Sequence, residues 1–192
     1  MESLSLRNNH LHDIHLDTFS DHFTPSLRSV DFSNNVLSFV DDNGHVKGGV
    51  PNYEGFGRRS PLRDCKRLEK IDLSNNSISL IFSDWTDNMA YLKLLNLSHN
   101  AITKLPIVPF MASNNSEIDV RFNKISEVID ERFKDGFWSN MKRKTDTRHY
   151  TWHLEGNPLE CNCQNYELFL HLQDQVNPKV RFVNYSPKER GS

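Results

Sequence analysis

The sequence predicts an α/β solenoid of about six coils, with one short parallel strand per coil. The first observation is a motif that recurs six times: an apolar residue, a gap, a second apolar residue and an asparagine three positions later. The second is an apolar residue two positions after each asparagine. The third is the spacing. Successive copies begin 26, 41, 24, 23 and 34 residues apart, and repeats that recur about every 20–50 residues are typical of solenoids. The copies are Leu4/Leu6/Asn9, Val30/Phe32/Asn35, Ile71/Leu73/Asn76, Leu95/Leu97/Asn100, Ile118/Val120/Asn123 and Trp152/Leu154/Asn157.

The polar residues between the apolar ones predict the concave face of the sheet. Side chains alternate along a strand, so Leu95 and Leu97 face the core while Asn96 faces outward. Acidic residues predominate in this outward column. Two interpretations stay open: a face that keeps an exposed sheet soluble, and a weak acidic strip that binds a partner. The binding candidates on the concave face are Asp31, Asp72, Asn96, Asp119, Arg121, His153 and Glu155.

The repeated asparagine predicts a structural ladder rather than a ligand site. A side-chain amide both donates and accepts hydrogen bonds, so it can satisfy the backbone groups of its own coil and of the next one. An asparagine at the same point of every coil would therefore stack along the solenoid. The expected ladder is Asn9, Asn35, Asn76, Asn100, Asn123 and Asn157.

Two long intervals predict insertions into the repeats, which span residues 1–160. The first, near 41–64, is rich in glycine and proline, which favours a loop over a missed repeat. The second, near 134–150, is basic and is interpreted as a solvated loop, with a binding site for an anionic patch of a partner or glycan as the alternative. In the returning segments we expect short turns or single helical turns. A longer helix is predicted over Asn165 to Gln175.

Composition and motifs exclude several functions. The net charge of −2 gives no indication of nucleic-acid binding, and no stretch approaches the roughly 18 apolar residues of a membrane span. No phosphate loop or nucleophile motif is present. His10, His12, His15 and His22 are interpreted as a coincidental cluster rather than a metal site. We therefore predict that the protein is not an enzyme and uses no cofactor.

The repeats, together with Asn157-Pro158-Leu159-Glu160-Cys161-Asn162-Cys163, resemble extracellular leucine-rich repeat proteins with a cysteine-rich C-terminal flank. The looped-out insertions and the phenylalanines of the returning segments make Toll and Toll-like receptor ectodomains the best match. The resemblance implies a horseshoe with a helical C-terminal cap, here a partial one over 161–192. It also implies that Cys161 and Cys163 form disulfides with later cysteines, which this sequence does not contain. We therefore expect a piece of a longer protein.

The resemblance also implies a function. It predicts a cell-surface receptor of innate immunity or development that recognises a protein ligand, or pairs with a second receptor chain or with itself, to signal. Any membrane attachment would come from a span outside these residues, and the endosomal lumen is an alternative location. Other possible functions are a secreted or matrix adhesion or immune protein and, third, a cytosolic adaptor. The candidate glycosylation sites are Asn75, Asn96, Asn114 and Asn184.

Overall fold

The computed structural model describes part of the chain, mainly the strands and the turns that follow them. The described residues are 1–15, 18–19, 26–40, 60–82, 85, 89–106, 116–129, 150–159 and 180–183. Within these ranges the elements with defined bounds are all strands. They are β1 (Ser3–Ser5), β2 (Ser29–Asp31), β3 (Lys70–Asp72), β4 (Leu94–Asn96), β5 (Lys104–Pro106), β6 (Ser116–Asp119), β7 (Glu127–Ile129), β8 (Tyr150–His153) and β9 (Val180–Val183).

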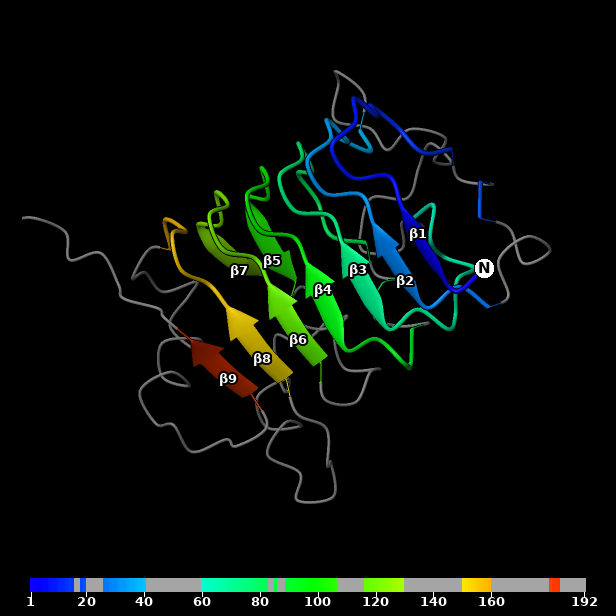
Figure 1. Cartoon of the computed structure of the whole chain (residues 1–192). Helices are drawn as coiled ribbons and strands as arrows, with labels where there is room; N and C mark the ends of the chain where they lie inside the picture. Colours follow the sequence, from blue (N-terminus) through cyan, green and yellow to red (C-terminus); the bar gives the residue numbers. More distant parts are fainter. Residues whose placement is uncertain are drawn as a thin grey trace, which may run out of the picture.

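Seven of these strands form one parallel sheet in the order β1-β2-β3-β4-β6-β8-β9 (Figure 1). The register places the first apolar residues of the six sequence motifs directly opposite one another. The aligned residues are Leu4, Val30, Ile71, Leu95, Ile118 and Trp152. The predicted parallel sheet of a leucine-rich repeat solenoid is therefore confirmed.

The seventh strand, β9, was not predicted from the sequence. It pairs with β8 in parallel and places Phe182 opposite Trp152. This strand lies within 161–192, the segment that the sequence analysis assigned to the cap. The segment lacks the motif, because Asn184 stands where the second apolar residue is expected and Pro187 where the asparagine is expected.

A second, two-stranded parallel sheet joins the returning segments of coils four and five. Strand β5 pairs with β7, and Leu105 lies opposite Val128. The expectation of short turns or single helical turns was therefore wrong for these two segments. Both strands begin four residues after their ladder asparagine, at Lys104 after Asn100 and at Glu127 after Asn123. This equal spacing brings the two backbones into register.

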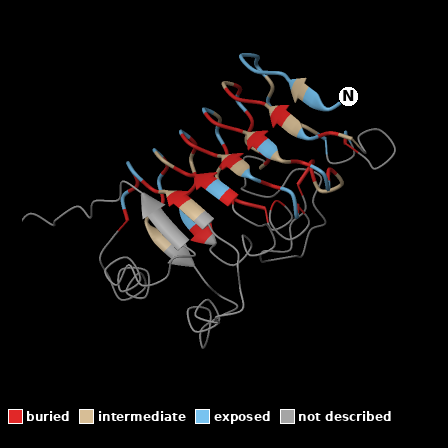
Figure 2. Ribbon diagram, turned by 60° about the horizontal axis from the view of Figure 1, so that its bottom comes forward, coloured by how far each residue is buried: buried red, intermediate tan, exposed pale blue. Residues whose placement is uncertain are grey.

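The core lies between the seven-stranded sheet and the returning segments. The apolar residues of coils two to six are buried, and Ile71, Leu73 and Ile78 are fully inaccessible to solvent. Strand β1 at the end of the sheet has no buried residue (Figure 2). Cys65, directly after the first insertion, also packs in this core. Burial of apolar surface is the main term that holds the coils together.

Several predicted segments lie outside the described residues. They are the helix over 165–175, most of both insertions (41–59 and 134–149), and the cap except for β9. The last residues of the first insertion are described and fold onto the core, since Ser60 and Leu62 are buried. Within the described ranges the structure contains no apolar helix of membrane-spanning length.

Candidate protein-binding face

The asparagines of coils two to six form a continuous ladder that fixes the spacing of the strands. Asn100 shows the pattern. Its Nδ2 donates to the carbonyls of Leu73 in the preceding coil, 2.9 Å away, and of Leu97 in its own coil, 3.1 Å away. Its Oδ1 accepts the N–H of Ile78 at 2.9 Å. The same three kinds of bond are made by Asn35, Asn76, Asn123 and Asn157.

Asn9 differs from the other ladder asparagines. It is exposed, and its Nδ2 donates to Leu6 and Arg7 of its own coil. The five buried or half-buried asparagines thus link neighbouring coils, whereas among the described residues Asn9 bonds only within its own.

The polar side chains on the side of the seven-stranded sheet turned away from the core make up what we call the outer sheet face. In coils two and three an aspartate at the end of the strand is held by the serine two residues later. Asp31 Oδ1 accepts from the Ser33 N–H at 3.0 Å and from its hydroxyl at 2.6 Å. Asp72 Oδ1 accepts the same two bonds from Ser74, at 2.9 and 2.7 Å. These bonds fix the position of each carboxylate before any partner arrives.

Coil four has an amide at the same position of the outer sheet face. Asn96 Oδ1 accepts from the N–H and the hydroxyl of Ser98, and its Nδ2 donates to Asp72 Oδ2 at 3.2 Å. Asn96 therefore connects the acidic part of the face to the strands that follow.

In coils five and six the charges of the outer sheet face are paired. The Arg121 guanidinium donates to both carboxylate oxygens of Asp119, with Nη2 2.6 Å from Oδ2 and Nε 3.0 Å from Oδ1. This hydrogen bond, with the charge of Asp119, raises the pKa of Arg121. His153 Nε2 lies 2.8 Å from Glu117 Oε1 on the neighbouring strand.

The outer sheet face therefore brings all seven predicted candidates together, but they are not equivalent. Asp119 is buried and neutralised by Arg121, and His153 is engaged by Glu117. Asp31 and Asp72 are half-buried carboxylates that have no ion pair among those described. Glu155 is exposed. Three carboxylates of this face thus have no described ion pair, and two of them, Asp31 and Asp72, lie on the adjacent strands β2 and β3.

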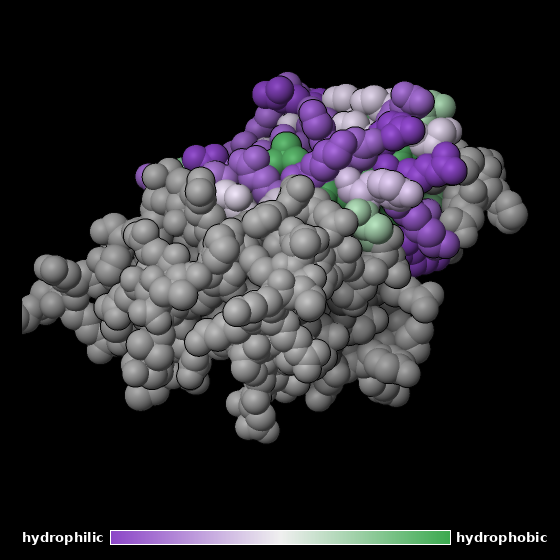
Figure 3. Space-filling model, turned by 90° about the horizontal axis from the view of Figure 1, so that it is seen from below, coloured by the Kyte–Doolittle hydropathy of each residue, from purple (hydrophilic) through white to green (hydrophobic). Residues whose placement is uncertain are grey.

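A chain of opposite charges runs along the edge where the strands begin, and the sequence analysis did not identify it. Arg28 Nη1 lies 2.5 Å from Glu69 Oε1, and Lys93 Nζ lies 2.6 Å from Glu69 Oε2. Glu2 approaches Arg28 at 4.0 Å. The described surface on this side is predominantly hydrophilic (Figure 3). Hydrogen bonds from Lys93 and Arg28 lower the pKa of Glu69.

We expect Glu69 to make stability depend on pH. A carboxyl whose folded-state pKa is lowered stabilises the fold above its ordinary pKa, and this contribution is lost as the pH falls through the lowered value. The variant Glu69→Gln should melt below the wild type near neutral pH, and the two Tm curves should converge in acid. Thermal melts of both proteins across this pH range test the expectation. A constant difference between the curves down to the lowest pH would contradict it.

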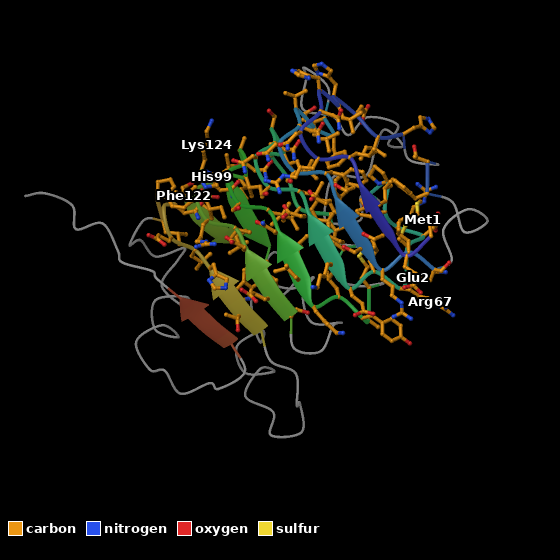
Figure 4. All side chains as sticks on the ribbon, in the orientation of Figure 1. Met1, Glu2, Arg67, His99, Phe122 and Lys124 are labelled. Atoms are coloured by element: carbon orange, nitrogen blue, oxygen red, sulfur yellow. The ribbon has the colours of Figure 1, made fainter. Side chains whose placement is uncertain are left out.

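The residues just before the ladder asparagines form a second row, which we call the turn row: Asn8, Asn34, Asn75, His99, Phe122 and Gly156. All six have positive φ, between 53° and 75°. In this row the His99 and Phe122 rings are stacked, with centroids 4.5 Å apart and planes 19° apart. Both rings lie beyond the carboxyl ends of the strands (Figure 4). Gly156 packs directly against the Phe122 ring, since a Cβ there would lie 2.5 Å from Phe122 Cδ1.

We expect Gly156→Ala to destabilise the chain by about 2–5 kcal/mol. The left-handed backbone, with φ at 75°, costs an alanine about 1–2 kcal/mol, and overpacking against the Phe122 ring adds about 1–3 kcal/mol. Urea unfolding of the single variant measures the total. In a Phe122→Ala background the same change should cost only the backbone part. An equal cost in both backgrounds would show that the ring contact plays no role.

Four other predicted site residues lie outside the described residues: Cys161, Cys163, Asn114 and Asn184. Asn75 is exposed on the turn row, and Asn96 is half-buried on the outer sheet face. Of the early histidines, His10, His12 and His15 are described. The described ranges contain no group of three or more His, Cys, Asp or Glu side chains able to hold a metal ion.

Comparisons with known proteins agree with the fold and indicate the class of protein to which the chain is similar. Residues 66–125 match the family described as "Leucine rich repeat". Protein toll of Drosophila melanogaster is 29% identical over 109 residues, which is 54% of this chain and 9% of that protein. Tsukushi of Gallus gallus is 38% identical over 61 residues, or 32% of this chain and 16% of that protein. The chain thus spans a small part of the length of these relatives.

Solved structures show the same fold. A chain of the glycosylated Toll–Spatzle complex of Drosophila covers 94% of this chain, with a TM-score of 0.60 and 24% identity, and the match covers 25% of that chain. A chain of the complex of Latrophilin 3, Unc5D and FLRT2 covers 98%, with a TM-score of 0.67 and 15% identity, over 49% of that chain. At these identities the structural matches support the fold alone.

The repeated strand, ladder asparagine and returning segment define a leucine-rich repeat solenoid. Within that class the chain resembles the ectodomain of a Toll-type receptor, and it is related to other extracellular leucine-rich repeat proteins.

Proposed function

We propose that the chain is a protein-binding part of the ectodomain of a Toll-type receptor, and that it recognises its ligand through the outer sheet face. The observation that carries the proposal is the preorganised pair Asp31 and Asp72 on a sheet held rigid by the asparagine ladder. Side chains already fixed in one geometry lose little conformational entropy on binding.

The charge of the outer sheet face indicates the kind of ligand surface that fits. Carboxylates outnumber the basic side chains on this face, and two of those without a described ion pair, Asp31 and Asp72, lie on adjacent strands. A partner surface that carries lysine or arginine complements them. Complementary charges mainly accelerate association, and salt weakens the effect.

Receptor pairing is the second part of the proposal. Relatives of known structure occur in assemblies with other proteins, such as Toll with Spatzle, and LRIM1 with APL1C. A second receptor chain, or a second copy of this one, is the partner expected for signalling in innate immunity or development. The alternative is a secreted or matrix adhesion protein of the Tsukushi kind, which uses the same solenoid without signalling. A cytosolic adaptor is the least favoured alternative, because the relatives are extracellular or cell-surface proteins.

Binding of the secreted protein to Drosophila Spatzle, measured by biolayer interferometry, tests the proposal. We expect saturable binding that the double variant Asp31→Asn/Asp72→Asn weakens about tenfold, which corresponds to about 1.4 kcal/mol. The matched control is Glu127→Gln, the same chemical change on β7 outside the outer sheet face. Equal affinity for the double variant and the control would contradict the proposed face. No binding of the wild type would favour the matrix alternative.

A further inference from the structure

We propose that Asn75 is an N-glycosylation site and that the first sugar of its glycan packs against the His99 ring. The inference rests on the proposed function, because this modification takes place in the secretory pathway. It also separates two of the four candidate sequons, which the sequence alone treats alike.

The Asn75-Asn76-Ser77 sequon is open on the turn row. Asn75 and Ser77 are both exposed, and neither side chain makes a hydrogen bond with the described residues. The backbone is nevertheless fixed: φ of Asn75 is 53° and its N–H donates to the Ser98 carbonyl at 3.0 Å. The amide nitrogen that would carry a sugar is thus unengaged on a rigid support.

The Asn96-Leu97-Ser98 sequon is engaged in the outer sheet face. Asn96 Oδ1 accepts the Ser98 hydroxyl at 2.8 Å, its Nδ2 donates to Asp72, and Ser98 is only 8% exposed. Coils two and three make the same serine bonds with Asp31 and Asp72. The sequon therefore arises because an asparagine replaces the aspartate of a strand-end motif, and a glycan there would compete with that motif.

The modification itself needs a lipid-diphosphate-linked oligosaccharide as donor. The bond between C1 of the first sugar and the phosphate oxygen breaks, and a bond forms between C1 and Asn75 Nδ2. The amide loses one proton and the lipid diphosphate leaves. The product keeps one N–H on the amide, and no charge is added to the chain at this position.

The aromatic stack gives the sugar a surface. Backbone bonds from Asn75 to Ser98, from His99 to Arg121 and from Phe122 to Glu155 order the row as Asn75, His99, Phe122 and Gly156. The 4.5 Å between the two rings is close to the spacing of roughly 4.8 Å between strands, so the stack runs along the row. Gly156 and His99 flank the Phe122 ring, which leaves the second face of His99 turned toward Asn75.

An N-acetylated pyranose suits that ring face. The face of an aromatic ring is electron-rich, and the axial C–H groups of a pyranose form a flat, slightly positive surface that packs on it. The sugar would extend the stack of Phe122 and His99 by one ring. It would shield the turn row at coil three and leave the outer sheet face open to a protein ligand.

Glycopeptide mass spectrometry of the secreted natural protein tests the site. After enzymatic deglycosylation in ¹⁸O-labelled water, we expect the label at Asn75 and none at Asn96, and Ser77→Ala should abolish it at Asn75. Label at Asn96, or an unlabelled Asn75 beside a labelled Asn114 or Asn184, would overturn the inference alone. A natural protein that never enters the secretory pathway would overturn the proposed function with it.

The melting temperature tests the sugar contact. With the glycan trimmed to its first sugar, the wild type should melt about 2 °C above Asn75→Gln, the shift expected for a contact of roughly 0.5–1 kcal/mol in a chain of this size. The shift should vanish in a His99→Ala background and persist in Lys124→Ala, an exposed control beyond the same strand ends (Figure 4). The same shift in both backgrounds would overturn the packing of the sugar on His99.

Discussion

Replacing Asn100 by alanine is expected to destabilise the solenoid by about 3 kcal/mol, because it leaves buried backbone groups without partners. The N–H of Ile78 loses its acceptor, and the Leu73 carbonyl loses one of its two asparagine donors. Both groups lie between packed coils where water cannot replace the side chain. Urea unfolding followed by circular dichroism measures the loss.

Asn9→Ala is the matched control, since it removes the same side chain from the same position of a coil. Asn9 is exposed and bonds within its own coil, so the expected cost is below about 1 kcal/mol. Similar losses for the two variants would contradict the view that the ladder stabilises the protein by linking coils.

Replacing Trp85 by alanine is expected to cost about 3–5 kcal/mol, the range for a large aromatic side chain in a core. Trp85 is fully buried and meets the Phe82 ring edge-on at 5.1 Å and the Phe39 ring at 6.4 Å. Phe39 is itself held at a φ of 57°, which is costly for a phenylalanine and depends on these contacts. Thermal and urea unfolding of the variant measure the effect.

Trp85→Phe should be much milder, at about 1 kcal/mol. The indole Nε1 is buried and has no hydrogen-bond partner among the described residues. Phenylalanine therefore gives up ring area but also removes a buried unsatisfied N–H, and the two effects oppose each other. A loss for Trp85→Phe as large as for Trp85→Ala would show that the indole N–H contributes a bond of its own.

The regular part of the fold could be predicted from the sequence because each coil repeats the same chemistry. The residues that align in the sheet, from Leu4 to Trp152, are the ones that open the six motifs. Strand β9 could not be found in this way, since Asn184 and Pro187 stand where the motif requires an apolar residue and an asparagine. Its pairing with β8 depends on the backbone rather than on a residue pattern.

The location of the outer sheet face could also be predicted, but its pairings could not. Alternation along each strand places Asp31, Asp72 and Asn96 outward, as the sequence analysis expected. The contact between Arg28 and Glu69 joins residues 41 positions apart, across the first insertion. Such pairs become visible only when the residues at equivalent points of neighbouring coils are compared.

The contacts of the turn row also become apparent only when equivalent positions of neighbouring coils are compared. The residue before the ladder asparagine is Asn in the first three coils, and His99, Phe122 and Gly156 follow in the next three. The change from amides to two rings and a glycine can be found in the sequence when this position is compared across the six coils. Its meaning depends on the positive φ that all six positions share.

Carboxyl footprinting of the protein with and without bound Spatzle tests the central claim most directly. A water-soluble carbodiimide labels accessible carboxylates, and mass spectrometry locates the label. If the outer sheet face binds the ligand, Asp31 and Asp72 lose reactivity in the complex while Glu127 on β7 keeps it. Unchanged labelling of Asp31 and Asp72, with protection of carboxylates elsewhere on the solenoid, would contradict the proposed binding face.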